Sequence, residues 1–273
     1  VFKVGTYKSA VEPYIAEQMS DANREQVSSY QQSIWNNMLK DVAKSRKTTA
    51  EALNSLADSL TILSGPEASV KGGLVDKLCY QDEVKKILKN KAKMDEDESL
   101  RFVSISDVAL SEELNDKVDD EIAVYYAYGE IKEDITGGFA QESAITSKQM
   151  TKDLQELRED DDVKAVVLRV NSPGGSAYAS EQIWREVQLL SKEKPVIVSM
   201  GALAASGGYY ISCGANKIFA EPTTLTGSIG IFGMIPDATE LLTDKLGLSF
   251  DVVKTNAHSD FGAMGRPLNE SEC

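Results

Sequence analysis

Two glycine-rich turns constrain this chain most, because each directly follows a short run of β-branched and apolar residues. Asn171-Ser-Pro-Gly-Gly-Ser176 follows Ala165-Val-Val-Leu-Arg-Val170, and Ala204-Ala-Ser-Gly-Gly-Tyr209 follows Pro195-Val-Ile-Val-Ser-Met200. Residues that can begin a helix come after each turn. A strand, a glycine turn and a helix, found twice in succession, predict neighbouring units of a parallel sheet covered by helices.

The rest of the chain after residue 116 continues this alternation of strands and helices. Further strands are expected at 122–128, 217–220 and 250–253, and helices are marked by Met150, Leu154, Leu157, Ile183, Val187, Leu190, Leu241, Leu242 and Leu246. The fold class expected from this pattern is α/β, with a parallel sheet flanked by helices.

Residues 1–115 are expected to be mostly helical. A helix is predicted from the three- and four-residue spacing of Val27, Tyr30, Ile34, Met38 and Val42, and a second from a capping box at Thr48 and Glu51. Trp35, and Cys213 in the later part, are expected to pack in apolar surroundings. The charged stretch 112–120 shows no periodicity and is expected to separate the two parts.

Composition excludes several classes of partner and site. The 273 residues carry a formal charge of −14, which disfavours direct binding to nucleic acid or to an anionic membrane surface. No apolar run approaches the length of a membrane-spanning helix. With one histidine and three scattered cysteines, no metal site or disulfide framework is indicated, and no cofactor is expected.

The second glycine turn offers a candidate nucleophile, Ser206, where a strand enters a helix. A hydroxyl there lies close to helix N-terminal N–H groups, and such groups stabilise an oxyanion. The candidate donors are Gly207 and either Gly174 or Gly175. Either turn alone is also typical of an ordinary strand–helix connection, but two of them in adjacent units favour a site.

Two side chains are candidates for the base that activates Ser206. His258 is the only histidine, and Asp260 is the only acidic partner evident near it. A lysine can serve instead if burial keeps its amine neutral. Lys8, which lies between a predicted strand end and a mixed apolar stretch, is the best-placed lysine, but physical reasoning from the sequence does not choose between these candidates.

Four motifs together resemble the bacterial signal peptide peptidase A family in its long, tandem-repeat form. They are Gly5-Thr-Tyr-Lys-Ser-Ala-Val-Glu-Pro13, Asn171-Ser-Pro-Gly-Gly-Ser176, Ala204-Ala-Ser-Gly-Gly-Tyr209 and Leu225-Thr-Gly-Ser-Ile-Gly-Ile-Phe-Gly233. The resemblance implies a Clp-protease/crotonase-like fold in each repeat and a serine–lysine dyad. By position it implies the following roles: Ser206 as nucleophile, Lys8 as base, Ser228 as the hydroxyl that positions the lysine, and Gly175 and Gly207 as oxyanion donors.

The resemblance also implies how the chain is organised and what it acts on. Residues 1–115 would be the C-terminal part of a first repeat, and 116–273 the N-terminal part of a second. A faint repeat of Val-x-Thr followed by Ser, at Val4–Ser9 and Val253–Ser259, agrees with this division. The implied protein is a periplasmic enzyme that cleaves hydrophobic signal-peptide remnants. It would be a homo-oligomer, tetrameric in its full length, and tethered to the bacterial inner membrane by an anchor absent from this chain.

Two other functions stay open. A crotonase-type acyl-thioester enzyme would share the fold and the backbone oxyanion hole, but it needs no serine at position 206. A non-catalytic scaffold of the same fold would leave the site idle. Because both repeats are expected to be incomplete here, the chain is also expected to be inactive or oligomeric when isolated.

Overall fold

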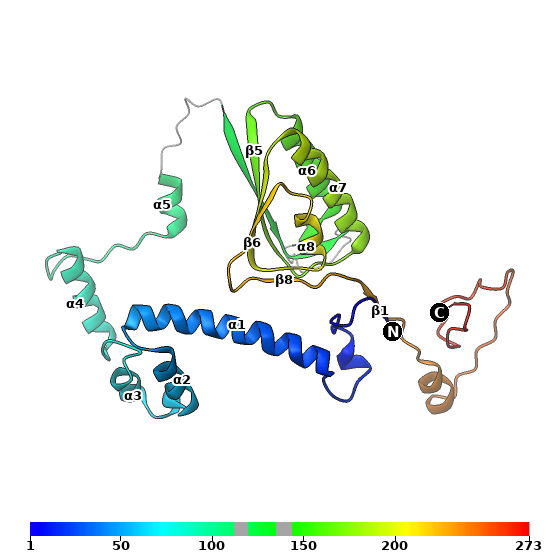
Figure 1. The fold of residues 1–273 in the computed structure, drawn as a ribbon, viewed down its shortest axis with the longest axis horizontal. Coiled ribbons are helices and arrows are strands. Elements are labelled where there is room, and N and C mark those ends of the chain that lie inside the picture. Colours follow the sequence, from blue (N-terminus) through cyan, green and yellow to red (C-terminus); the bar gives the residue numbers. More distant parts are fainter. Residues whose placement is uncertain (112–119, 135–143, 273) are drawn as a thin grey trace.

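The computed structural model describes residues 1–111, 120–134 and 144–272, and Figure 1 shows their arrangement. At the centre is a parallel sheet in the order β2 (Glu121–Tyr128), β5 (Val163–Ser172), β6 (Val196–Ala205) and β7 (Lys217–Phe219), with β8 (Leu225–Gly227) also pairing with β6. The parallel sheet predicted from the sequence is therefore present.

The helices α6 (Ser147–Glu159) and α7 (Ala177–Glu193) cover one face of this sheet. Each begins at a hydroxyl residue, Thr146 or Ser176, whose side chain accepts a backbone N–H three residues later. The fully buried side chains beneath them come from alternate positions of β5 and β6 and from one stripe of each helix: Val166, Leu168, Val170, Val196, Val198, Leu154, Ile183, Val187 and Leu190. The opposite face of the sheet carries exposed apolar side chains along β2.

The first part of the chain is mostly helical, as predicted. Its elements are η1 (Glu12–Tyr14), α1 (Asp21–Arg46), α2 (Ala50–Asp58), η2 (Thr61–Leu63), α3 (Pro66–Lys71), α4 (Gln81–Ala92) and α5 (Ile105–Ser111). The long helix α1 runs below the sheet in Figure 1. The expected division at 112–120 falls almost entirely outside the described residues.

Several local predictions were wrong. The residue that caps α2 is Thr49 rather than Thr48, since its side chain accepts the N–H of Ala52. Of the apolar positions on α1, Ile34 and Met38 are exposed, whereas Leu39 is buried. Trp35 is half-buried in an apolar hollow between α1 and α2, as expected. Cys213 is exposed rather than packed in the core.

Two short pairs of strands lie outside the central sheet. β1 (Phe2–Lys3) pairs with β9 (Phe232–Gly233) in antiparallel fashion, and β3 (Glu130–Lys132) pairs with β4 (Ala144–Thr146) in parallel. The helix predicted near residue 241 is the single π-helical turn η3 (Leu241–Lys245). The strand predicted at 250–253 is absent, since no strand pairs with that stretch among the described residues. Within the described ranges, no helix has the length and hydropathy needed to cross a membrane.

Candidate active site

Ser206 lies between the end of β6 and the start of α8 (Gly207–Ser212). Its backbone has φ 54° and ψ −116°, a conformation that side-chain-bearing residues rarely adopt. Backbone strain of this kind is held only where the surrounding structure determines it, and it is concentrated at functional sites. The strained turn presents the Ser206 hydroxyl at the carboxyl edge of the sheet, where ligands of open parallel sheets bind.

Two neighbouring segments fix this turn from opposite sides. The N–H of Ser206 donates to the carbonyl of Gly227 at the end of β8, at 2.9 Å. On the other side is Gly174, with φ +96°, where an added Cβ would lie 2.5 Å from the nitrogen of Gly207. Only glycine allows the two turns to come this close.

The first glycine turn is itself held by two polar side chains of its motif. The Asn171 Oδ1 accepts the N–H of Leu203 at 3.0 Å, where the ladder between β5 and β6 shifts register. The buried Ser172 hydroxyl donates to the carbonyl of Gly129 at 2.7 Å and accepts the N–H of Gly174 at 3.1 Å. These residues therefore shape the turn rather than take part in chemistry.

Lys8 brings its amine directly to the Ser206 hydroxyl. The Nζ atom lies 3.1 Å from Ser206 Oγ, 3.1 Å from Ser228 Oγ and 2.8 Å from the carbonyl oxygen of Ser228. A neutral amine has two hydrogens and one lone pair. With both hydrogens donated to the oxygen atoms of Ser228, the lone pair is left for the proton of Ser206.

The surroundings of Lys8 favour this neutral form. The side chain is only 6% exposed, and no carboxylate forms an ion pair with it in the described part of the chain. Burial without a compensating charge disfavours the ammonium and lowers the pKa of Lys8 below its ordinary value. The sequence left the base open between Lys8 and His258, and the structure places Lys8 beside Ser206.

Lys8 reaches this position through the pairing of β1 with β9. The ladder continues past the two strands, because the N–H of Val4 donates to the carbonyl of Ile231 at 3.0 Å. Gly230, with φ +130°, allows a close approach here, since a Cβ on it would lie 2.5 Å from the oxygen of Val4. The residues that carry the amine and the hydroxyl are 198 positions apart in sequence, and this short ladder joins them.

The two predicted oxyanion donors line the same cavity as Ser206. Gly207 is the first residue of α8, so its N–H has no acceptor within its own helix. The N–H groups on either side of Gly175 are used, by Ser172 Oγ and by the carbonyl of Ile131. The described hydrogen bonds leave the N–H of Gly175 itself without an acceptor.

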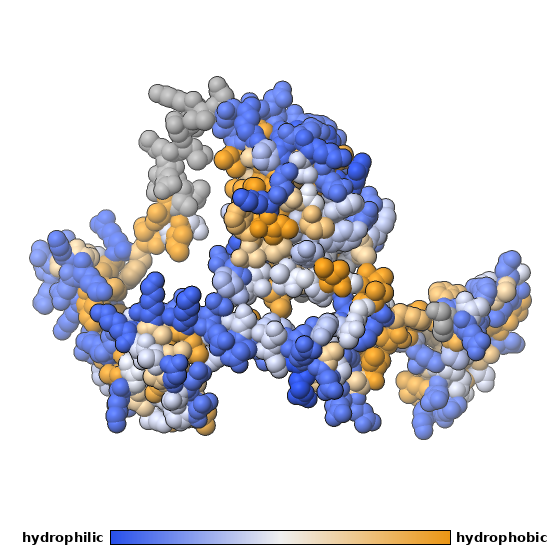
Figure 2. Space-filling model, viewed as in Figure 1, coloured by the Kyte–Doolittle hydropathy of each residue, from blue (hydrophilic) through white to orange (hydrophobic). Residues whose placement is uncertain are grey.

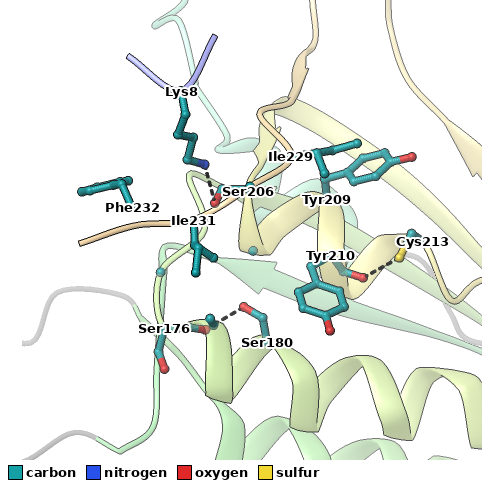
Figure 3. A pocket seen from close by; sticks show the side chains of 14 residues that line it. Lys8, Ser176, Ser180, Ser206, Tyr209, Tyr210, Cys213, Ile229, Ile231 and Phe232 are labelled. Carbon is teal, nitrogen blue, oxygen red and sulfur yellow. Dashed lines mark hydrogen bonds between the residues drawn. The ribbon is translucent and has the colours of Figure 1, made fainter. Parts of the chain in front are cut away.

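Ser206 is at the junction of two cavities. The first, of about 660 Å³, has mainly apolar and aromatic walls: Tyr209, Tyr210, Ile229, Ile231 and Phe232, with Cys213 at its side. Figure 3 shows the Lys8 amine pointing to Ser206 on one side of this cavity, with Tyr210 and Ser180 on the other. The second cavity, of about 990 Å³, extends from Ser206 towards α1.

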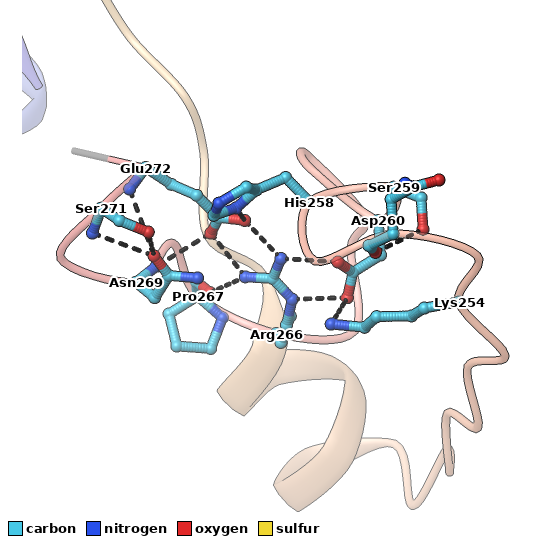
Figure 4. Close-up of polar contacts among 10 residues, drawn as sticks. Lys254, His258, Ser259, Asp260, Arg266, Pro267, Asn269, Ser271 and Glu272 are labelled. Carbon is cyan, nitrogen blue, oxygen red and sulfur yellow. Dashed lines mark hydrogen bonds and ion pairs between the residues drawn. The ribbon is translucent and has the colours of Figure 1, made fainter.

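The alternative base, His258, belongs to a different cluster near the C-terminus. Its Nδ1 lies 3.3 Å from Glu272 Oε1, and its side chain is 55% exposed. Asp260, the partner considered from the sequence, is held by Arg266 at 2.7 Å and by Lys254 at 2.7 Å (Figure 4). His258 lines neither of the cavities that contain Ser206.

Sequence reasoning missed the residues that form the walls of the site. The apolar wall from Ile229 to Phe232 could have been inferred from its alternation with glycine in the fourth motif. The polar side chains of α1 that face the second cavity carry no sequence signal, because their role depends on where the helix docks. Among the described residues no group of acidic, histidine or cysteine side chains is suited to hold a metal ion.

Comparison with known proteins gives matches over the whole chain. The profile described as Peptidase family S49 matches residues 1–95 and 188–272, and the profile described as Clp protease matches residues 109–225. Together with the sheet described above, the second match confirms the predicted Clp-protease-like α/β fold.

Individual relatives are all longer than this chain. Protease 4 of Salmonella typhi is 40% identical over 95% of this chain and 42% of its own length. Protease 4 of Haemophilus influenzae is 36% identical over 99% of this chain and 45% of its own length. The chloroplastic serine protease SPPA of Arabidopsis thaliana is 32% identical over 100% of this chain and 40% of its own length. The chain thus spans less than half the length of these relatives.

Proposed function

The chain belongs to peptidase family S49, and on that premise we propose that it is a serine endopeptidase whose nucleophile is Ser206 and whose base is Lys8. The observation that carries this proposal is the 3.1 Å distance between Lys8 Nζ and Ser206 Oγ in a buried setting that favours the neutral amine. Ser228 positions the amine by accepting two hydrogen bonds from it.

In this proposal the reaction proceeds through an acyl-enzyme. Lys8 accepts the proton of Ser206 while Oγ bonds to the carbonyl carbon of the peptide, and the oxyanion is stabilised by the N–H groups of Gly175 and Gly207. The C–N bond then breaks as Lys8 gives the proton to the leaving nitrogen. A water molecule, deprotonated by Lys8, then bonds to the acyl carbon. The bond from that carbon to Ser206 Oγ breaks, and Lys8 returns the proton to Oγ, which releases the acid and restores Ser206.

We further propose that the substrates are hydrophobic peptides, including the remnants of signal peptides. Support comes from the apolar walls of the first cavity, where Ile229, Ile231 and Phe232 provide surface for an apolar side chain. In this proposal the peptide binds in extended conformation beside a strand. By the family resemblance, the same proposal places the protein in the periplasm, attached to the inner membrane.

The nucleophile is tested with Ser206→Ala. In the full-length protein we expect peptidase activity to be lost while the melting temperature stays close to that of the wild type, since one small hydroxyl is removed from a turn held by other contacts. A fluorophosphonate should label Ser206 in the wild type, as located by mass spectrometry. Labelling of Ser228 or Ser172 in place of Ser206 would contradict the assignment.

The same experiment separates the two alternatives considered from the sequence. A scaffold with an idle site would show neither labelling nor hydrolysis. A crotonase-type enzyme would act on acyl thioesters and keep that activity in Ser206→Ala.

A further inference from the structure

We propose that the second cavity, between Ser206 and α1, binds the segment of the substrate on the C-terminal side of the cleaved bond, and that the Gln26 side chain accepts a hydrogen bond from an N–H of that segment. This inference rests on the proposed peptidase function and adds a specificity-determining residue to it. No catalytic step is assigned to Gln26.

The two cavities differ in chemistry although they meet at the same hydroxyl. Both are lined by Lys8, Gly175, Ser206 and Phe232. Beyond these shared residues the first cavity is walled mainly by apolar and aromatic side chains, whereas the second has a mixed wall, in which α1 contributes Val27 and several polar side chains. The polar residues contributed by α1 are Asn23, Gln26, Ser29 and Tyr30. One substrate chain passing the nucleophile therefore meets two different environments.

The positions of Lys8, which carries the proton, and of the oxyanion donors indicate which cavity binds each half of the substrate. Gly207 lines only the first cavity, so the acyl half, whose carbonyl oxygen it stabilises, belongs there. The leaving nitrogen has to receive its proton from Lys8. Ser9 follows Lys8 in the sequence, and Ser228 accepts hydrogen bonds from its amine. Both serines line only the second cavity. The leaving half therefore extends towards α1.

A chain of hydrogen bonds fixes the orientation of the Gln26 amide. Glu12 Oε2 accepts from Asn23 Nδ2 at 3.0 Å, so Asn23 must turn its oxygen towards Gln26. Gln26 Nε2 donates to that oxygen at 3.1 Å and to Ser9 Oγ at 2.6 Å. The opposite orientation would place two amide oxygens against each other.

This orientation leaves Gln26 Oε1 as an acceptor at the wall of the cavity. Both amide hydrogens are used, and no hydrogen bond among the described residues ends on Oε1. Apart from Lys8, the cavity is lined by no lysine or arginine within the described part of the chain, and it includes Glu130, whose carboxylate pairs with Lys132 at 3.0 Å. The acceptor of Gln26 suits a leaving segment, whose amine and amide N–H groups are donors.

Acyl transfer to added amines measures binding at this subsite separately from binding of the acyl half of the substrate. A peptide ester acylates Ser206, and water or an added amine then competes for the same acyl-enzyme. In the amine reaction the nitrogen bonds to the acyl carbon, the bond to Ser206 Oγ breaks, and Lys8 passes the amine proton to that oxygen. The ratio of the two products does not depend on how fast the acyl-enzyme forms.

The amines to compare are serinamide and its N,N-dimethylamide, which lacks the carboxamide N–H. We expect the wild type to favour serinamide by about twofold to tenfold, the range given by one neutral hydrogen bond. In Gln26→Leu this preference should be lost, so that the two amines are used about equally. Gln32→Leu, on the same helix but exposed and bonded to Asn36, should keep it.

The outcomes separate this inference from the proposed function. If the ester is turned over and Gln26→Leu retains the wild-type preference for serinamide, the assignment of Gln26 is wrong while the peptidase function stands. If the ester neither acylates Ser206 of the full-length protein nor is hydrolysed by it, the proposed function is wrong, and so is the assignment of this subsite. Because the preference is a ratio within one variant, a partly unfolded sample does not alter it.

Discussion

At the scale of single residues, the proposed chemistry depends on two unusual environments, which arise in different ways. Ser206 holds a strained backbone with φ 54°, and Lys8 is an amine that is only 6% exposed. The strained turn could be predicted from the sequence, since a serine between a β-branched run and two glycines is a local signal. The burial of Lys8 could not, because it depends on a strand that approaches from the other end of the chain.

The pH dependence of activity tests the role of Lys8. Burial lowers the pKa of its amine, and only the neutral amine accepts a proton, so activity should rise with pH through that lowered pKa and then level off. Lys8→Arg should be inactive throughout, since arginine stays charged. The measurement is kcat/KM against pH. Substantial activity in Lys8→Arg would contradict this role for Lys8.

Lys8 should also affect the stability of the fold. Between the lowered pKa of the folded protein and the ordinary pKa of the unfolded chain, the unfolded chain binds more protons, so the free energy of unfolding rises with pH across that interval. Lys8→Met removes the titrating group. We expect this variant to be inactive and to lose that part of the pH dependence, as measured by urea unfolding at several pH values.

At the scale of elements, the short pairing of β1 with β9 assembles the site. The parallel strands β2, β5 and β6 follow from continuous apolar runs and were predictable, as were α6 and α7 from their stripes. A strand at the start of the chain, at residues 1–4, was also expected, but its pairing with β9 was not, because a two-residue strand such as β9 carries no periodicity. The prediction of a strand at 250–253 was wrong for a related reason: strand formation depends on pairing, and this apolar stretch has no partner strand among the described residues.

Gly230 offers a test of this ladder. A Cβ at this position would lie 2.5 Å from the carbonyl oxygen of Val4, and φ is +130°, so Gly230→Ala should push the Lys8 segment away from Ser206. We expect a loss of activity of at least tenfold. Gly233→Ala is the matched control, because a Cβ there meets nothing within 4 Å. Equal activity in the two variants would show that the ladder does not position Lys8.

At the scale of the whole molecule, one face of the central sheet is left uncovered by the residues that the structure describes. On that face β2 exposes Ile122 (68%), Val124 (50%) and Tyr126 (65%), and Figure 2 shows hydrophobic residues along this side of the sheet. Parallel sheets are covered on both faces in most proteins. We therefore keep the proposals, made from the sequence, that the protein is a homo-oligomer and that residues 1–115 and 116–273 belong to successive repeats.

Light scattering tests the oligomer. We expect a mass that is a multiple of 29.7 kDa for this chain, and a lower mass for Val124→Glu, which places a charge on the uncovered face. Gln155→Glu, on the solvent side of α6, is the control and should not change the mass. A monomeric wild type would contradict the proposal.

If the proposed dyad is right, the separation of Lys8 from Ser206 determines when a newly synthesised chain can first become active. The amine and the hydroxyl are 198 residues apart. At a synthesis rate of about 5–20 residues per second, the ribosome adds the serine roughly 10 to 40 s after the lysine. Strand β9, which brings the two together, is made later still. During that interval the nascent chain holds the amine of the proposed dyad without the hydroxyl. The order of synthesis therefore keeps the chain without peptidase activity until both groups have been made and β9 has paired with β1.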